Sequence, residues 1–282
     1  MSNRISILLT CHNRKKDTLE SLSALTRAVE HAGDIISEIF LVDDASTDGT
    51  ASSVKFEFPK VRIIEGDGNL FWNRGMIRAW QEAVAVESDF YLWLNDDTNL
   101  QEDAIAILLK DSGAKNHESI FCGICESSDK TYISYSGCLL RDKKRLIPTG
   151  IPQACDYFNG NVVLIPKSVF DKVGYLDSFF HHTLGDVDYG LRAKKLGVAS
   201  FVSSKVVATC DRHNSLPIWC NPKYSLKQRL AHFRTPLAKN PEEIFYFEKR
   251  HTSFLMALYR ASVIYIRLAF PRLWILLGKA QI

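Results

Sequence analysis

Short apolar runs alternate with segments of helical periodicity along the first half of the chain. Residues 15–32 have apolar positions at helical spacing, and the segments that begin near Ser46 and Asn73 predict two further helices. The apolar runs of strand length between them are residues 5–10, 38–44, 61–66 and 89–97. Strands that alternate with helices predict βαβ units and a largely parallel sheet, in which ligands lie at the carboxyl ends of the strands.

The second half of the chain has a looser pattern. Residues 186–197 predict a helix that ends at Gly197, and apolar runs before and after it read as strands. These runs are TYISYSGCLL, GNVVLIPKSVF and ASFVSSKVVATC. Beyond Pro217 the periodicity is helical and the charge is basic, which places a domain boundary near residue 215. The expected organisation is an α/β domain over residues 1–215, with halves of about 1–100 and 101–215, and a helical extension over residues 216–282.

Charge is unevenly distributed along the chain. Hydrophobic residues make up 46% of the sequence and charged residues 24%, which is typical of a globular protein and excludes a low-complexity chain. Twelve Lys and Arg against three Glu give the segment from Arg212 onward a charge of +9, against −6 for residues 1–211. The chain therefore has a basic tail beside an acidic body.

The seven cysteines are scattered and odd in number. The polar residues Ser2, Asn3 and Arg4 precede the first strand and resemble no secretory signal, so we expect a cytoplasmic protein. Cys122 and Cys125 form a single CxxC pair without a second pair at zinc-ligand spacing, which favours buried or incidental cysteines.

Two acidic clusters follow predicted strands. Asp43 and Asp44 either precede a helix cap and turn or accept hydrogen bonds from a base or ribose. Asn95, Asp96 and Asp97 either form a turn before a helix or hold a hard cation such as Mg²⁺ or Mn²⁺. Adjacent carboxylates repel one another, and a bound cation offsets that repulsion.

A third acidic pair, Asp186 and Asp188, opens a predicted helix. Both residues fit a helix cap and a dipole contact, or one of them is a general base that takes a proton from a hydroxyl. The preceding FFHHTLG favours the base, because aromatic and histidine residues crowd a segment that is otherwise expected to be polar. His213 reads as a surface residue unless a metal is bound nearby.

Together these segments resemble the family 2 glycosyltransferases, which have the GT-A fold. ISILLTCHNR, LVDDASTDGT, LWLNDDT, YFNGNVVLIPKSVFDKVGYLD and LGDVDYGLRAKKLG occur in that family's order and spacing, over residues 4–214. With GDGNLFWNRGM at residues 66–76, the chain is more similar to the bacterial subset that builds O-antigen and capsule polysaccharides. The resemblance implies a Rossmann-like α/β fold: a mixed, mainly parallel sheet flanked by helices, with a basic C-terminal helical extension.

The resemblance also implies roles for particular residues. Asp186 matches the catalytic base, and Asp97 with His213 matches the site of Mg²⁺ or Mn²⁺. The residues implied at the nucleotide are Thr10, His12, Asn13, Asp43, Asn73, Asn95 and Asp96. Those implied at the donor and acceptor sugars are Trp72, Gly160, Asn161 and Asp188. Two residues differ from the family's motifs and reduce their negative charge: Asn95 replaces the usual first aspartate, and Gly185 replaces a glutamate.

The implied activity is inverting, metal-dependent transfer of a sugar from a nucleotide-sugar donor to a hydroxyl of a lipid-linked glycan acceptor, in cell-surface polysaccharide synthesis. The alternatives are a sugar-phosphate nucleotidyltransferase and a non-catalytic glycan- or lipid-binding scaffold of the same fold. A nucleotidyltransferase usually has a glycine-rich phosphate loop near its N-terminus, and TCHNRKKD contains no glycine.

The basic tail suggests contact with a membrane surface. Arg260 and Arg267 interrupt its apolar run, which leaves too few uncharged residues to span a bilayer. Ser253, Arg260 and Arg267 are seven residues apart and predict a polar stripe on an interfacial helix that binds anionic lipid at the cytoplasmic face of the inner membrane. The alternative is a helix packed on the catalytic domain or in a homo-oligomer interface. No nucleic-acid motif is present, so no nucleic-acid partner is expected.

Overall fold

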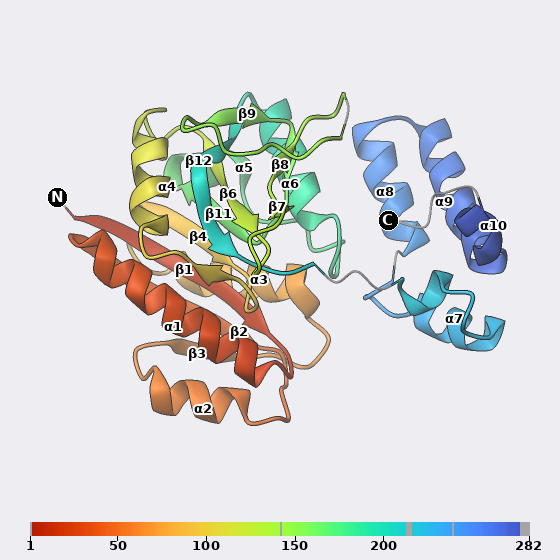
Figure 1. Cartoon of the computed structure of the whole chain (residues 1–282), viewed down its shortest axis with the longest axis horizontal. Helices are drawn as coiled ribbons and strands as arrows, with labels where there is room; N and C mark the ends of the chain where they lie inside the picture. The colour runs from red at the N-terminus through yellow and green to blue at the C-terminus, as the bar shows by residue number, and fades with distance from the viewer. Residues whose placement is uncertain (1, 142, 213–215, 239, 277–282) are drawn as a thin grey trace. The chain divides into compact units, whose positions relative to one another are not determined.

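The computed structural model describes residues 2–141, 143–212, 216–238 and 240–276 (Figure 1). The chain forms two compact units. The first contains residues 1–178 and 185–212, and the second contains residues 179–184 and 213–282. The short segment 179–184 therefore belongs with the C-terminal helices, although both of its neighbours in the sequence belong to the first unit.

The first unit contains strands and helices in alternation. Its strands are β1 (Asn3–Cys11), β2 (Ile35–Asp43), β3 (Arg62–Glu65), β4 (Phe90–Leu94), β5 (Asn99–Leu100), β6 (Ile120–Glu126), β7 (Ile133–Tyr135), β8 (Gly137–Cys138), β9 (Gln153–Cys155), β10 (Tyr157–Phe158), β11 (Val162–Pro166) and β12 (Ser200–Thr209). Its helices are α1 (Lys15–Ala32), α2 (Thr50–Glu57), α3 (Phe71–Ala83), α4 (Ala104–Gly113), α5 (Lys167–Val173) and α6 (Gly185–Lys195).

Among the described residues, ten strands form one sheet, with the order β3-β2-β1-β4-β11-β6-β12-β5 along its main path. The two longest registers, β1 with β2 and β12 with β6, are parallel, and β1 also pairs in parallel with β4. Strand β11 is antiparallel to both of its neighbours. The sheet is mixed and mainly parallel, as expected from the sequence.

The strand order reverses beside β1. The chain runs outward from β1 through β2 to β3 and then returns to place β4 on the other side of β1. Cys11 pairs with Asp43, and Asp43 pairs with Glu65, so strands β1, β2 and β3 end at the same level. A reversal of this kind opens a crevice at the carboxyl ends, which is the usual ligand site of such sheets.

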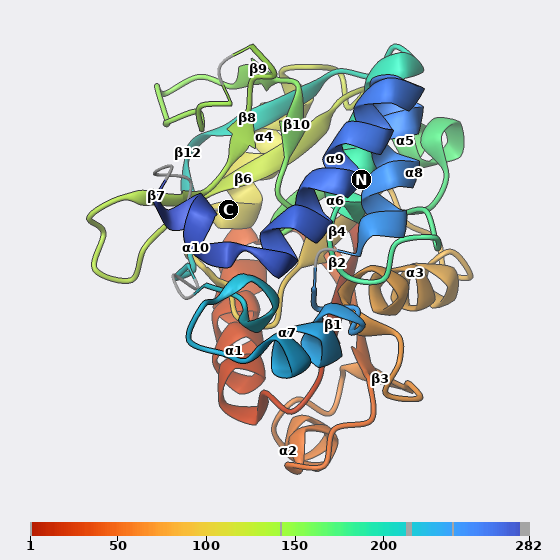
Figure 2. The ribbon, with the colours of Figure 1, turned by 90° about the vertical axis from the view of Figure 1, so that its right-hand side faces the viewer.

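Alternating side chains of β1 pack into two cores. Ile5, Ile7 and Leu9 face the core formed with α1, α2 and α4, whereas Leu8 faces the core formed with α3, α5 and α6. In Figure 2, α3 and α5 lie on the right-hand side of the sheet. Strand residues point alternately to opposite faces, so an apolar run with few polar interruptions indicates a strand covered by helices on both faces.

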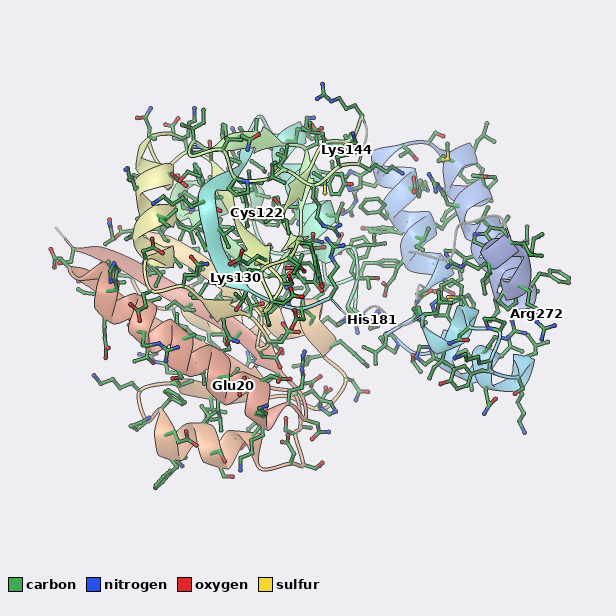
Figure 3. The ribbon with its side chains drawn as sticks, viewed as in Figure 1. Glu20, Cys122, Lys130, Lys144, His181 and Arg272 are labelled. Atoms are coloured by element: carbon green, nitrogen blue, oxygen red, sulfur yellow. The ribbon has the colours of Figure 1, made fainter. Side chains whose placement is uncertain are left out.

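Two parts of the sequence prediction for the second half change. GNVVLIPKSVF does not form one strand, because β11 ends at Pro166 and Lys167 begins α5. The CxxC pair lies on β6, which the apolar pattern did not single out. Cys122 and Cys125 are both buried, in the cores on opposite faces of the sheet. Figure 3 labels Cys122 in the region of the sheet. This confirms that they are buried cysteines.

The second unit contains a short 3₁₀ helix and four α-helices among its described residues. These are η1 (Ile218–Cys220), α7 (Leu226–Phe233), α8 (Pro241–His251), α9 (Phe254–Ala269) and α10 (Pro271–Leu276). Ser253, expected within a continuous helix, instead precedes α9, where its Oγ accepts a hydrogen bond from the Met256 N–H. Within the described residues, no helix is long and apolar enough to cross a bilayer.

Candidate active site

The loops that follow β1 and β2 are tied to one another. The Asn13 N–H donates to Ser46 Oγ (2.9 Å), and Asn13 Oδ1 accepts from the Thr47 N–H (2.7 Å). His12 Nδ1 lies 2.5 Å from the carbonyl oxygen of Asp44. Asn13 has a φ of 52°, a left-handed conformation that asparagine adopts more readily than most residues. His12 and Asn13 therefore lie in a rigid loop pair at the carboxyl edge of the sheet.

Asp43 and Asp44 are adjacent but have different partners. Asp43 Oδ1 accepts from the Ser46 N–H (3.0 Å) at the mouth of the β2 loop. Asp44 is buried and accepts hydrogen bonds from three backbone N–H groups, those of Gly68 (2.7 Å), Leu70 (2.9 Å) and Phe71 (2.9 Å). Asp44 therefore holds the loop that leads to Trp72, a role that the sequence analysis did not assign.

Replacing Asp44 with alanine is expected to destabilise the protein by about 2–4 kcal/mol, because three amides of residues 68–71 lose a charged acceptor. Urea unfolding, monitored by circular dichroism, measures the loss. Asp67→Ala is the matched control, since the side chain of Asp67 accepts only a local hydrogen bond from the Asn69 N–H. Equal stability of the two variants would contradict the role of Asp44.

The residues after β4 meet side chains from two other elements. Trp72, at the start of α3, donates from Nε1 to Asn95 Oδ1 (2.7 Å). Arg14, at the start of α1, places Nη1 3.2 Å from Asp96 Oδ1 and Nη2 2.9 Å from Asp97 Oδ2. Arg14 was not a candidate in the sequence analysis, although it ends the TCHNR segment at the carboxyl end of β1.

The two aspartates differ in exposure. Asp96 is 6% exposed, and its Oδ2 has no hydrogen-bond partner among the described residues. Burial raises the pKa of Asp96 to about 7, while Arg14 lowers this pKa and Asp97 raises it. The Asp97 side chain is 20% exposed, and its Oδ1 lies 3.7 Å from Cys210 Sγ.

This donor set fits a hard divalent cation. Carboxylate oxygens are the ligands that Mg²⁺ and Mn²⁺ prefer, and the buried Asp96 Oδ2 has no hydrogen-bond donor among the residues that the structure describes. No group of three His, Cys, Asp or Glu side chains surrounds a common cation position within the ranges that the structure describes. A cation bound by Asp97 and its neighbour would have room for ligands from a bound molecule. His213, the other expected ligand, lies outside the described residues.

Asp186 lies in the first turn of α6. Its Oδ2 accepts from the Gly160 N–H (2.8 Å), and its Oδ1 accepts from the Val187 N–H (2.8 Å). Burial raises the pKa of Asp186 above its ordinary value of 3.8, against the opposing effect of these hydrogen bonds. A Cβ added at Gly160 would lie 2.6 Å from the Trp72 ring, so glycine is required for the indole to lie beside Asp186.

A continuous series of contacts joins the two acidic positions. The Asn95 N–H donates to the Asn161 carbonyl oxygen (2.9 Å), and Asn161 Nδ2 lies 3.5 Å from Cys210 Sγ, beside Asp97. From Asn95 the contacts continue through Trp72 to Gly160 and Asp186. The structure thus brings together several candidates that are distant in sequence: Trp72, Asn95, Asp96, Asp97, Gly160, Asn161 and Asp186.

Comparison with known proteins agrees with this geometry. The family model described as glycosyl transferase family 2 matches residues 6–174. The chain belongs to glycosyl transferase family 2. This confirms the family, and with it the glycosyltransferase class, that the sequence motifs resemble. The match ends before Asp186, so the position of that residue in this family 2 chain comes from the structure.

Solved structures show the same fold at low sequence identity. The S. aureus TarS 1-349 structure has a TM-score of 0.55 and 14% identity, over 95% of this chain and 87% of that chain. The S. aureus TarS 1-349 complex with UDP-GlcNAc has a TM-score of 0.56 and 14% identity, over 91% of this chain and 73% of that chain. The corresponding complex with UDP has a TM-score of 0.54 and 15% identity, over 89% and 72%. A search of curated proteins finds no match.

Two residues that the resemblance implies at the nucleotide, Thr10 and Asn73, are buried against neighbouring elements. Thr10 is buried against α3, where a Cβ added at Gly75 would lie 2.3 Å from Thr10 Oγ1. Asn73 is fully buried and donates from Nδ2 to the Asp177 carbonyl oxygen (2.8 Å). A Cβ added at Gly185 would lie 1.8 Å from Asn73 Oδ1, which explains why a larger residue does not precede Asp186.

Asp188, which the resemblance implies at the sugars, pairs with Arg192. Its side chain is fully buried, and its Oδ2 accepts from Arg192 Nε (2.8 Å). Arg192 in turn donates to the carbonyl oxygens of Val173 and Tyr175, which lie at and just beyond the end of α5. One turn of α6 therefore has two different acids: Asp186, which meets Gly160, and Asp188, which joins α6 to α5.

The raised pKa of Asp186 predicts a pH-dependent difference in stability between the wild type and Asp186→Asn. Between pH 3.8 and the raised pKa the folded state binds more protons than the unfolded state, so the wild type loses stability as pH rises through that window. The variant has no such titration, and its melting temperature should therefore gain on the wild type as pH rises from 3.8 toward the raised pKa of Asp186. A constant difference over this range would mean that Asp186 has the same pKa in both states.

Proposed function

We propose that this family 2 chain is an inverting, metal-dependent glycosyltransferase that moves a sugar from a nucleotide-sugar donor to a hydroxyl of a lipid-linked glycan. The observation that supports this proposal most directly is the series of contacts between Asp97 and Asp186, which runs through Cys210, Asn161, Asn95, Trp72 and Gly160. They place a candidate phosphate-side carboxylate and a candidate base in one group of contacts, as transfer of a sugar between two oxygens requires.

The carboxyl ends of β1 and β2 would bind the nucleoside of the donor. His12, Asn13 and Asp43 lie in the loops at this edge, beside the reversal in strand order. The structures of TarS with UDP-GlcNAc and UDP support a donor of this class. Asp97, with Asp96, would hold Mg²⁺ or Mn²⁺, and a bound cation supplies positive charge to the oxygens of the leaving diphosphate.

Asp186 would act as the general base. The acceptor hydroxyl attacks the anomeric carbon, its proton passes to Asp186, and the bond from that carbon to the diphosphate oxygen breaks. Attack from the side opposite the leaving group inverts the configuration without a covalent enzyme intermediate. The Gly160 N–H holds Asp186 Oδ2 in position, and Trp72 supplies an apolar wall for the sugar.

A panel of nucleotide sugars tests the proposal. Melting temperatures measured with each compound, with and without Mn²⁺, should rise for the true donor through ligand linkage, and more so with Mn²⁺. No rise with any nucleotide sugar would overturn the proposal. Consumption of a nucleoside triphosphate and a sugar phosphate, with release of pyrophosphate, would identify a nucleotidyltransferase instead.

The lipid-linked acceptor, as in O-antigen and capsule synthesis at the cytoplasmic face of the inner membrane, is supported by the exposed apolar residues of α9. Leu255 is 77% exposed and Tyr259 is 60% exposed, and the partly exposed Arg260 follows them. Large exposed apolar side chains beside basic ones are typical of helices that bind anionic lipid surfaces.

Sedimentation with vesicles measures this contact. The wild type should sediment with anionic vesicles and less with neutral ones. Leu255→Glu should weaken binding by about tenfold or more, since it places a charge where the apolar side chain would enter the lipid. Phe56→Glu is the matched control, because Phe56 is 88% exposed on α2. Equal binding of both variants, or a change in oligomeric state of Leu255→Glu alone, would contradict the membrane contact.

A further inference from the structure

The guanidinium of Arg14 lies where a cation is needed. It bridges two carboxylates, Asp96 through Nη1 and Asp97 through Nη2, and its Nε lies 3.4 Å from Asp17 Oδ2. Asp96 is nearly fully buried, so its charge has little water to stabilise it. Arg14 therefore neutralises a crowded acidic group in the donor-free protein.

The same contacts compete with a divalent cation. Asp97 Oδ2, at 2.9 Å from Nη2, already uses a lone pair toward Arg14, and a metal at Asp97 would lie beside a fixed positive charge. Asp96 Oδ2 has no partner within the described residues, but it belongs to a carboxylate whose other oxygen is also held by Arg14. Two cations at this pair repel one another unless an anion joins them.

A diphosphate is such an anion. Arginine pairs with phosphate oxygens through two parallel N–H groups, and divalent cations bridge phosphates to carboxylates. The Arg14 side chain is 33% exposed and lies at the start of α1, where the helix N-terminus also favours negative charge. A diphosphate that reaches this exposed part of the side chain would offer Arg14 a partner of greater charge than Asp97.

We infer that Arg14 is a diphosphate-binding residue that stands in for the metal in the donor-free protein and moves from Asp97 to the diphosphate when donor and metal bind together. This inference rests on the proposed function. According to this inference, the metal and Arg14 compete for Asp97 in the absence of nucleotide, and both bind the diphosphate in its presence. Binding of metal alone is then weak, and metal and nucleoside diphosphate each strengthen the binding of the other.

Two measurements on Arg14→Gln test the inference. Binding of Mn²⁺ alone is followed by the electron paramagnetic resonance signal of free Mn²⁺, and binding of UDP, GDP and dTDP in Mn²⁺ is followed by calorimetry. Loss of the competing charge should raise the affinity for Mn²⁺ alone by about tenfold, while affinity for the nucleoside diphosphate in Mn²⁺ should fall by about tenfold or more. Arg27→Gln, with the same charge change at an exposed position of α1, should change neither.

The opposite signs of the two shifts separate the inference from a general loss of structure. An affinity for Mn²⁺ alone that is unchanged or reduced in Arg14→Gln would overturn it, as would an unchanged nucleoside diphosphate affinity. Arg14→Lys decides if Arg14→Gln does not fold, because lysine keeps the charge but cannot bridge both carboxylates. Arg14→Lys should show both affinity changes at smaller size. The absence of both changes would count against the inference. If the wild type binds none of the three nucleotides, the proposed function fails. The Mn²⁺ affinity of Arg14→Gln still tests whether Arg14 competes with the metal.

Discussion

Replacement of Asp186 with asparagine is expected to reduce sugar transfer by about 10²–10⁴-fold, the usual contribution of a positioned general base. Asparagine has nearly the same shape as aspartate and keeps an oxygen that can accept from the Gly160 N–H, although its NH₂ group cannot accept from the Val187 N–H. It cannot take a proton from an acceptor hydroxyl. The initial rate of nucleoside diphosphate release measures the loss, with the donor that raises the melting temperature and a lipid-linked glycan acceptor.

Binding separates this chemical defect from a structural one. Affinity for the nucleoside diphosphate in Mn²⁺ should remain within about twofold of the wild type, since a group that acts only in the transition state contributes little to ground-state binding. Asp171→Asn is the control, because Asp171 is an exposed residue of α5 that pairs with Lys167. Transfer at the wild-type rate by Asp186→Asn would remove this residue as the base.

Replacement of Asp97 with asparagine is expected to weaken nucleoside diphosphate binding in Mn²⁺ by at least about tenfold, equivalent to ~1.4 kcal/mol. The physical reason is the loss of one negative charge and one strong ligand from a cation that uses few protein oxygens. In EDTA the variant should bind the nucleotide at least as tightly as the wild type, because it lacks a carboxylate that repels the diphosphate and holds Arg14. Calorimetry under both conditions gives the comparison.

The metal dependence of the Asp97 defect is the deciding feature. An equal loss of affinity in Mn²⁺ and in EDTA would show that Asp97 acts on the nucleotide directly or on the structure. Asp171→Asn again serves as the control, with no expected change in either condition. The folded structure of Asp97→Asn can be checked by its melting temperature, since Arg14 keeps Asp96 as an ion-pair partner when Asp97 loses its charge.

The candidate site was predictable where it depends on strand ends. Asp43 and Asn95 follow apolar runs, and parallel strands bring their carboxyl ends to one edge whatever their separation in sequence. The loops after β1 and β2 therefore meet, as the contact between Asn13 and Ser46 shows. The resemblance to the family extended this prediction to Gly160 and Asp186, which periodicity alone could not bring to the same place.

The sequence alone could not predict which side chains of an element face the site. Asp186 and Asp188 lie two residues apart on one helix, so their side chains point about 200° apart, and only packing determines which one meets the site. Asn73 and Thr10 match family positions, but they pack against glycines of neighbouring elements, at Gly185 and Gly75. A single sequence has no record of those close approaches.

Two charged residues were missed for a related reason. Asp44 was treated with Asp43 as half of one acidic pair, yet its three amide donors come from residues 68–71, more than twenty positions away. Arg14 was part of a quoted motif, but its two carboxylate partners follow a different strand. The energy of a charge depends on what surrounds it in space, and these neighbours are not adjacent in sequence.

Periodicity and the polar strand ends thus determine the fold class and predict the edge of the sheet at which ligands would bind, and the motifs predict the family, because these features are local patterns along the chain. Packing settles which acids face the crevice and which are buried, that Ser253 begins a helix rather than continuing one, and that Arg14 occupies the carboxylate pair. These outcomes depend on burial and on contacts between distant segments, which exist only once the chain has folded.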